Sequence, residues 1–509
     1  MAVALAVGVM PLAPSVARAQ STPAPLPNQL PALGDSVSGE FGVGTERQLG
    51  DRIMAEIRRD PAYFSDPLLD DYLESLWQQL LAAARARGEV SPELRDRFAW
   101  QAFLLRDRTV NAFALPGGYV GVHLGLMALT GTRDELASVL AHELSHVTQR
   151  HIARSLVKGK QQSLVAMASL IVGMLAASRS PQAANAMIAG GQAAALQGQL
   201  NFSRDMEREA DRIGFLVLEE AGFSSAGMSS MFERLQQNSR VNDSGAFPYL
   251  RTHPLTSERI GEARARQGAT PARAGRDVLE HALMQARARV LMDPRPDSWR
   301  AWLRPAAQAD AGTGGRVLAL ATRAQAATQL REWAAAESAL AELAPLVERE
   351  PRAMRSLSML AAEMWLLRGD AGRADQALAN WRGDGSRAME LMSARVGLAA
   401  QGPGSEARLK RTAEDLQGWV ALRATDLQAW ELLAQTWERL GQPLRAVRAQ
   451  AEARYLVGDV QGAIDRLRAA QSLSRSGAQS DFIEAQVVDA RLRQWEQEWR
   501  ERVREEAGR

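Results

Sequence analysis

The chain of 509 residues contains no cysteine. Disulfides, thiol nucleophiles and zinc–thiolate sites are therefore excluded, and any metal must be bound by histidine and carboxylate groups. Charge of one sign is not in excess either, because 61 Lys and Arg residues stand against 59 Asp and Glu residues. These charges are interspersed along predicted helices, and the absence of a Lys/Arg block argues against a nucleic-acid partner.

Long apolar runs are also missing. No run reaches the roughly 20 residues that a membrane-spanning helix needs, so we expect no integral membrane span. The first 19 residues are instead typical of a secretory signal peptide, with an apolar stretch leading to Ala17-Arg18-Ala19, although no Lys or Arg precedes that stretch. We predict export and cleavage there, with a disordered apolar tail as the alternative, and a soluble mature protein. Residues 20–45 are rich in Pro, Ser and Gly and predict a flexible leader.

The length exceeds what one hydrophobic core usually supports, which predicts at least two domains. We place the first at residues 46–300 and the second at residues 301–509. Periodicity and turn residues in the first domain predict helical structure over about 46–81, a strand over 98–105, and a strand pair or a strand and turn over 111–126. They also predict a helix from Thr132 and a helix over 203–220 that ends at Gly222.

An almost wholly apolar segment, Leu164 to Ala177, lies between the last two of these helices. It is too short to span a bilayer. A buried helix is the simplest interpretation, and a lid or a segment that contacts a membrane surface is the alternative.

The second domain changes character, because Ala, Leu, Arg and Trp recur there at the spacing of a helix–turn–helix repeat of about 34 residues. Large and small residues alternate as that repeat requires at Trp365, Gly369, Ala374 and Leu378, at Trp430, Leu433, Ala434, Trp437, Gly441 and Ala446, and more weakly at Ala339, Leu343 and Pro351. The register that ends at Gly441 continues by one helix at Gly458, Ala463, Leu467 and Ala470. We predict a tetratricopeptide-like solenoid, whose concave groove is normally a surface that binds a partner protein.

The string His142-Glu143-Leu144-Ser145-His146 carries the chemistry of the first domain. Residues i and i+4 of a helix share a face, so both imidazoles can reach one metal ion while Glu143 lies beside it. Glu143 is then placed to take a proton from an attacking water molecule and to pass it to the leaving amine of a peptide. With only 6 histidines in the chain, this spacing is improbable by chance.

Two imidazoles need a third ligand, and the run from Glu207 to Asp211 offers carboxylates on the second long helix. Glu207 and Asp211 share a face, whereas Glu209 points elsewhere. Taken alone, this run has an ordinary acidic helix face as its alternative. His151 lies off the face that His142 and His146 share, and we expect it on the helix surface.

The pairing of H-E-x-x-H with E-x-x-A-D about 60 residues later resembles the HtpX-like zinc metallopeptidases, which include the CAAX-processing proteases. The stretch at 111–118, Asn-Ala-Phe-Ala-Leu-Pro-Gly-Gly, is similar to that family too. The resemblance implies a zincin-like domain with one zinc ion per chain and Glu207 as the third ligand. It implies a site role for Asp211, which is sometimes assigned proton donation in the family. On physical grounds we favour Asp211 as the group that orients a ligand histidine through a hydrogen bond.

The strand that contains Gly118, Tyr119 and Val120 is then expected to be the edge against which an extended substrate pairs. The fold class that we predict is mainly α, with an α+β catalytic domain, a small sheet with an edge strand and a helical repeat solenoid. A signal peptide, a catalytic domain without membrane spans and C-terminal repeats together resemble the periplasmic beta-barrel assembly-enhancing subgroup. In that subgroup the histidine of an R-T-H-P string, here His253, can complete the zinc shell and hold the enzyme latent.

The resemblance implies a periplasmic metalloendopeptidase, possible association with the outer membrane, substrates that are unfolded or misassembled outer-membrane proteins, and a groove that binds the outer-membrane assembly machinery. An alternative is an assembly chaperone or adaptor that acts through its repeats while cleavage is mostly silent. A third interpretation is a repeat scaffold with a structural metal, but such sites usually have four protein ligands and no adjacent base, so Glu143 argues against it.

Overall fold

The computed structural model describes residues 41–158, 203–241, 247–267, 278–304, 312–475 and 482–507. The predicted signal peptide, most of the predicted leader and the apolar segment from Leu164 to Ala177 lie outside these residues. In the described ranges, no helix has both the length and the apolar character that crossing a membrane requires.

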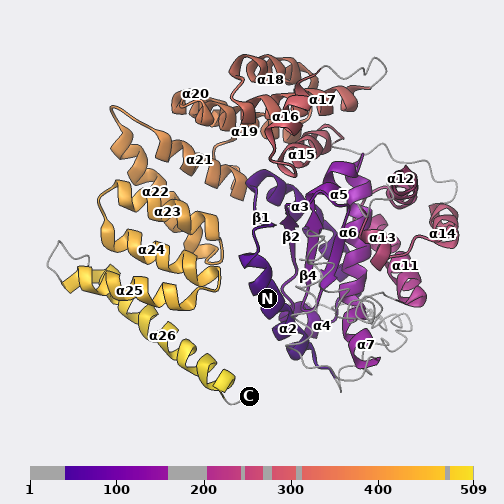
Figure 1. Cartoon of the computed structure of the whole chain (residues 1–509), viewed down its shortest axis with the longest axis horizontal. Coiled ribbons are helices and arrows are strands. Elements are labelled where there is room, and N and C mark those ends of the chain that lie inside the picture. The colour runs from indigo at the N-terminus through magenta and orange to yellow at the C-terminus, as the bar shows by residue number, and fades with distance from the viewer. Residues whose placement is uncertain are drawn as a thin grey trace, which may run out of the picture.

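The described residues before α16 form helices around a small sheet (Figure 1). Its elements up to the first gap are α2 (Val43–Arg59), β1 (Tyr63–Phe64), α3 (Pro67–Ala86), α4 (Pro92–Arg97), β2 (Gln101–Leu105), β3 (Ala112–Leu115), β4 (Tyr119–His123), α5 (Leu124–Leu129), α6 (Arg133–Thr148) and α7 (His151–Lys158). Those after it are α11 (Arg204–Glu220), α12 (Ala226–Val241), α13 (Tyr249–Thr252), α14 (Ser257–Gln267) and α15 (Val278–Leu291).

The four strands of the sheet have the order β1-β2-β4-β3. Strand β4 pairs antiparallel with β3 on one side and parallel with β2 on the other. The prediction that Gly118, Tyr119 and Val120 form the substrate edge is therefore wrong, because both sides of this strand are already paired. The turn at 116–118 correctly indicated a hairpin, but a hairpin alone does not tell which of its strands receives the third strand.

Strands β1 and β3 are the two edges of the described part of this sheet, and β3 packs against α6. The segment predicted as a strand pair over 111–126 also ends differently, because the chain turns into helix α5 at Leu124. The outer edge of β3, at residues 112–115, thus lies next to the helix that carries the H-E-x-x-H string.

Helix α6 begins where the sequence predicts, since the Thr132 hydroxyl accepts a hydrogen bond from the backbone N–H of Glu135 (3.1 Å). The Glu135 carboxylate reaches back to the N–H of Gly131 (2.6 Å), one residue earlier than in a standard capping box. Helix α11 crosses α6 closely at Gly214, where an added Cβ would meet the carbonyl oxygen of Ala141 at 3.1 Å. This close crossing brings the two motif-bearing helices together.

The described residues from 296 to 507 form a series of paired helices, which we call the repeat arm. Its elements are α16 (Pro296–Leu303), α17 (Thr313–Leu330), α18 (Trp333–Val347), α19 (Pro351–Leu367), α20 (Ala371–Leu378), a short 3-10 helix (Ala379–Trp381), α21 (Arg387–Ala399), α22 (Ser405–Leu422), α23 (Leu427–Arg439), α24 (Pro443–Leu456), α25 (Val460–Arg475) and α26 (Phe482–Ala507). In Figure 1 the arm forms an arc that runs from the top of the view (α16–α20, red to orange) down the left side (α21–α26, orange to yellow).

The predicted helix–turn–helix pattern is confirmed as packed helix pairs. Ala374 and Leu378 are buried in α20, and Trp430 and Leu433 are buried in α23. Gly441, with φ of +68°, lies between α23 and α24 in the left-handed conformation that favours glycine. The sequence therefore predicted the fold class, mainly α with a small sheet and a helical repeat region.

The arm is joined to the sheet-containing part by shared packing. Helix α15 packs against both α5 and α17, and α21 packs against α3. One hydrophobic cluster includes Leu76 of α3, Leu283 of α15 and Met392 of α21. The two domains that we placed on either side of residue 300 thus share a continuous core.

Candidate metal centre

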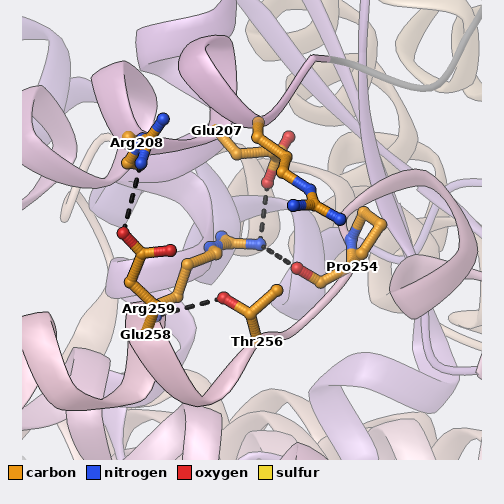
Figure 2. A pocket seen from close by; sticks show the side chains of 7 residues that line it. Glu207, Arg208, Pro254, Thr256, Glu258 and Arg259 are labelled. Atoms are coloured by element: carbon orange, nitrogen blue, oxygen red, sulfur yellow. Dashed lines mark hydrogen bonds and ion pairs between the residues drawn. The ribbon is translucent and has the colours of Figure 1, made fainter.

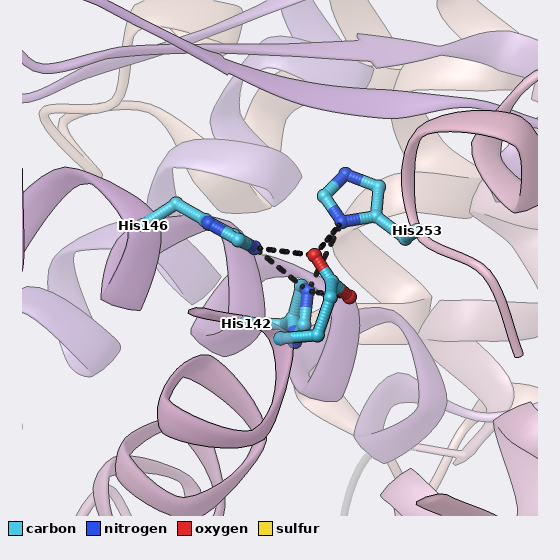
Figure 3. Close-up of side chains that lie close together, drawn as sticks. His142, His146 and His253 are labelled. Atoms are coloured by element: carbon cyan, nitrogen blue, oxygen red, sulfur yellow. Dashed lines mark hydrogen bonds and ion pairs between the residues drawn. The ribbon is translucent and has the colours of Figure 1, made fainter. Parts of the chain in front are cut away.

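Four buried side chains converge between α6, α11 and the residue that follows α13 (Figure 3). His142 and His146 come from α6, Glu207 from α11, and His253 caps the C-terminus of α13. Their potential ligand atoms all lie within 4.8 Å of one another. Each of these residues is at most 3% exposed. The structure therefore brings together the two motif histidines, the predicted third ligand and the predicted switch residue.

The separations between these atoms match the edges of a tetrahedral metal site. Nε2 of His142 lies 3.0 Å from Nε2 of His146 and 3.3 Å from Nδ1 of His253. Oε1 of Glu207 lies 2.9 Å from Nδ1 of His253 and 3.4 Å from Nε2 of His146. Four ligands at about 2.0–2.1 Å from a tetrahedral ion would be about 3.3 Å apart. Three imidazoles and a carboxylate thus fit a divalent transition metal.

Glu143 lies beside this cluster without a hydrogen-bond partner among the described residues. It is 0% exposed, and neither carboxylate oxygen accepts a hydrogen bond. The nearest charged or imidazole group is Nε2 of His253, at 3.5 Å from Oε1. A buried carboxylate without donors is costly to maintain, so its presence calls for a functional explanation. These surroundings suit a general base, because the Glu143 carboxylate is free to accept a proton when water and substrate enter the site.

Asp211 contacts the centre through His142, because its Oδ1 lies 2.9 Å from Nδ1 of that ring. This leaves Nε2 of His142 directed at the cluster. Arg259 of α14 holds Asp211 with two hydrogen bonds of 2.7 and 2.8 Å, and its Nη1 lies 2.8 Å from Oε2 of Glu207. The same guanidinium donates to the carbonyl of Pro254, the residue after His253. One arginine thus ties together Asp211, Glu207 and the His253 segment.

Figure 2 shows Arg259 in the wall of a pocket of about 170 Å³. Glu207 and Pro254 also line this pocket. The sequence pattern gave no indication of Arg259, because it follows the R-T-H-P string without a recognisable metal-ligand spacing. It also missed Tyr249, whose ring stacks on His253 at 4.6 Å between centroids. The one available signal was proximity in sequence to His253.

His151 corrects a prediction. We expected it on the helix surface, but it is 0% exposed, with Nδ1 2.8 Å from Nδ1 of His146 and Nε2 3.0 Å from Oε2 of Glu209. The prediction assumed that one helix continued through this residue. Instead α6 ends at Thr148, and Arg150 adopts a left-handed conformation (φ +51°). This bend turns His151 back toward His146.

Electrostatics separates the protonation states within the cluster. Burial opposes ionisation of Glu207 and Asp211, but His253 and His142 next to Glu207, and His142 and Arg259 next to Asp211, outweigh it and hold the pKa of each carboxyl below its usual value. Burial also lowers the pKa of His146. For His142, hydrogen bonds to Asp211 and Glu207 outweigh burial and raise the pKa to about 10.

Comparison with known proteins identifies the family of this domain. The model of peptidase family M48 matches residues 67–267, a range that contains all four clustered residues and Glu143. The chain carries a peptidase family M48 domain. It is a metallopeptidase domain, and the buried group of three histidines and Glu207 is its candidate metal site.

Relatives of the chain are proteases by name. A putative beta-barrel assembly-enhancing protease of Vibrio cholerae is 37% identical over 265 residues, which is 52% of this chain and 52% of that protein. The beta-barrel assembly-enhancing protease of Escherichia coli is 29% identical over 469 residues, covering 92% of this chain and 91% of the relative. The mitochondrial metalloendopeptidase OMA1 of Saccharomyces cerevisiae is 30% identical over 195 residues, or 37% of this chain and 53% of that protein.

Proposed function

We propose that this chain is a zinc-dependent endopeptidase that cleaves unfolded or misassembled proteins. The observation that carries the proposal is the buried convergence of His142, His146 and Glu207 next to the unpartnered carboxylate of Glu143. Zinc is favoured over other divalent ions because it accepts imidazole and carboxylate ligands in tetrahedral geometry. One ion per chain follows from the single cluster of this kind in the described residues.

When bound, the zinc ion supplies Lewis acidity for the peptide carbonyl and for a water molecule. Glu143 takes a proton from the water and delivers it to the leaving amine. The Asp211 carboxylate lies 2.9 Å from Nδ1 of His142 and so keeps that ring oriented. The edge strand β3, at Ala112–Leu115, offers backbone groups to an extended substrate next to α6. Because only an extended backbone can pair with this strand, such binding favours unfolded substrates.

His253 is proposed as a switch ligand. Its Nδ1 is a fourth donor in the cluster, at the position that water and substrate must share in a catalytic site. Movement of the His253 segment is then required for turnover. We expect His253→Ala to raise cleavage of unfolded casein several-fold and to weaken zinc binding. Unchanged cleavage and unchanged zinc affinity would contradict the switch.

The substrate class and the compartment are proposed from the relatives and the sequence. Two relatives are named for enhancing beta-barrel assembly, and one of them aligns with nearly the whole chain. We therefore propose that the substrates are misassembled outer-membrane proteins and that residues 1–19 direct the chain to the periplasm. The repeat arm, with tetratricopeptide-like helix pairs, is proposed to bind the assembly machinery at the outer membrane.

The decisive experiment compares wild type, Glu143→Gln and Glu219→Gln on unfolded casein, with and without a chelator. Glu219 is exposed on α11 and supplies a matched loss of one negative charge. We expect cleavage by wild type and Glu219→Gln, abolished by the chelator, and a loss of about 10²–10⁴-fold for Glu143→Gln. Robust cleavage by Glu143→Gln, or cleavage that survives removal of metal, would overturn the proposed function.

A chaperone or adaptor role remains the second candidate, favoured by the names of the two relatives and by the size of the repeat arm. Light scattering from an aggregating outer-membrane protein separates the two. Suppression of aggregation that is equal for wild type and Glu143→Gln supports a chaperone role. Suppression that vanishes with Glu143→Gln means that proteolysis alone removes the aggregating protein.

A further inference from the structure

We propose that His151 and Glu209 are positioning residues that fix the tautomer and the orientation of the metal ligand His146. The inference rests on the proposed metal site and deepens it. Both residues lie behind His146, on the side away from the other ligands' donor atoms: His151 contacts Nδ1 of His146, whereas Nε2 of His146 faces His142 and Glu207.

The hydrogen-bond pattern dictates where the protons are. Oε2 of Glu209 lies 3.0 Å from Nε2 of His151, and a carboxylate oxygen only accepts, so Nε2 of His151 carries the hydrogen. Nδ1 of a neutral His151 is then an acceptor. It lies 2.8 Å from Nδ1 of His146, which must therefore donate. A neutral His146 with its hydrogen on Nδ1 has its lone pair on Nε2, directed at the metal site.

Glu209 is held as a charged acceptor by a second partner. Nη1 of Arg154 lies 2.8 Å from the same Oε2 atom that accepts from His151. His151 is 0% exposed, so water does not replace its hydrogen bonds. The sequence His146–His151–Glu209–Arg154 thus forms a continuous chain from the metal site to a partly buried ion pair.

His142, the other candidate ligand on α6, is held in a similar way. Nδ1 of His142 contacts Asp211, and Asp211 is held by Arg259. Each ligand histidine of the H-E-x-x-H string is therefore backed by a carboxylate and an arginine, directly for His142 and through one further imidazole for His146. The bend at Arg150 that turns His151 inward is what makes the second chain possible.

The test measures zinc affinity of the full chain by competition with a chromophoric chelator. His151→Leu removes the acceptor, whereas His151→Asn keeps an acceptor oxygen near the position of Nδ1. We expect zinc affinity to fall about 10–100-fold for His151→Leu, the usual effect of losing such a partner, and to recover for the most part in His151→Asn. Glu209→Gln should show a smaller loss, and Glu219→Gln on the same helix should show none.

If His151 has only a structural role, its variants should lose zinc affinity in proportion to their loss of folding stability. Thermal unfolding with a chelator present separates the two, and Glu209→Gln, which alters a side chain that is 21% exposed, provides the milder variant. Zinc affinity within two-fold of wild type for both His151→Leu and Glu209→Gln would overturn the proposal. A loss equal for His151→Leu and His151→Asn would overturn it as well.

Nitrogen-15 NMR of histidine-labelled protein gives a second readout that does not depend on cleavage. We expect a hydrogen on Nδ1 of His146 and on Nε2 of His151, and loss of the first assignment in His151→Leu. Failure of both zinc-loaded wild type and zinc-loaded His253→Ala to cleave casein would contradict the endopeptidase function and leave the positioning role intact. Wild type that binds no zinc would overturn both.

Discussion

Two buried arginines in this molecule have nearly the same surroundings and different consequences. Arg259 holds Asp211 through two hydrogen bonds and pairs with Glu207 at 2.8 Å. Arg287 of α15 holds Asp66 through two hydrogen bonds of 2.6 Å and pairs with Glu363 at 2.7 Å. Each guanidinium is 5% exposed. The geometry of the ion pairs alone therefore does not distinguish a metal centre from a structural junction.

The difference lies in what else the carboxylates contact. Asp211 and Glu207 face the imidazoles of His142 and His146, so their charge is available to a metal site. Asp66 instead caps α3 by accepting from the N–H of Leu69, and Glu363 lies on α19 of the repeat arm. The first arginine holds the carboxylates of the candidate metal centre, and the second fastens the arm to the sheet-containing part.

The first α-helical turn of α3 extends this junction. Asp70 pairs with Arg387, and Asp71 pairs with Arg355, both from the repeat arm. Helix α3 also packs against α6 and α11, which carry the metal-binding motifs. The same helix thus contacts the arm at its beginning and the metal-bearing helices along its length.

The largest expected effect on stability comes from breaking the junction. Arg287→Met leaves the buried Asp66 without its counter-charge, and removal of one member of a buried ion pair typically costs about 3–5 kcal/mol. We expect the free energy of unfolding in urea to fall by about that amount while zinc affinity of the folded chain is unchanged. A zinc affinity that falls with the stability would remove the distinction between the two arginines.

The corresponding change at the metal centre should act on the metal. Arg259→Met frees Asp211 and Glu207, and we expect zinc affinity to fall about 10–100-fold, together with casein cleavage. Arg208→Gln is the control, because Arg208 of α11 makes only exposed ion pairs among those described, with Asp205 and with Glu258 of α14. If Arg259→Met binds zinc as tightly as Arg208→Gln does, Arg259 has only a structural role.

A smaller, pH-dependent effect is expected from a buried histidine at the junction. The Tyr72 hydroxyl donates to Nδ1 of His281, and Nε2 of His281 donates to the carbonyl of Thr130. Burial lowers the pKa of His281 from 6.5 to about 4, against the opposing effect of the Thr130 carbonyl. The unfolded chain therefore binds more protons between these values, so stability is complete above about pH 6.5 and is lost as the pH falls toward 4.

Urea unfolding of wild type and His281→Gln at pH 7.5 and 5.5 measures this contribution. We expect wild type to lose about 1 kcal/mol more than the variant between these two values. Equal losses would mean that His281 has the same pKa in the folded and unfolded chains. Both proteins are kept saturated with zinc, so that the metal-site histidines contribute equally to the two measured losses of stability.

The residues that the sequence predicted correctly are those whose placement follows from one regular helix. His142 and His146 share a face because α6 runs unbroken from Arg133 to Thr148. The start of α6 at Thr132 and the end of α11 before Gly222 follow from local capping chemistry. The pairing of α6 with α11 required a family resemblance, because periodicity does not tell which helices cross.

The failures occur where tertiary structure decides. His151 was misplaced because the left-handed conformation of Arg150 interrupts the helical period, and a non-glycine residue gives no local signal of that conformation. The prediction of a substrate edge at residues 118–120 is wrong because β4 pairs in parallel with β2 and so lies inside the sheet. These two strands are separated in sequence, and no local pattern indicates their pairing. Arg259 was missed since its role depends on α14 packing against α11.

The central claim is tested most directly by anomalous X-ray diffraction at the zinc edge, on crystals of the full chain loaded with zinc. The account predicts one strong peak per chain, about 2.0–2.2 Å from Nε2 of His142, Nε2 of His146 and a carboxylate oxygen of Glu207. A chain without a peak there, or with its zinc bound away from Glu207, would contradict it.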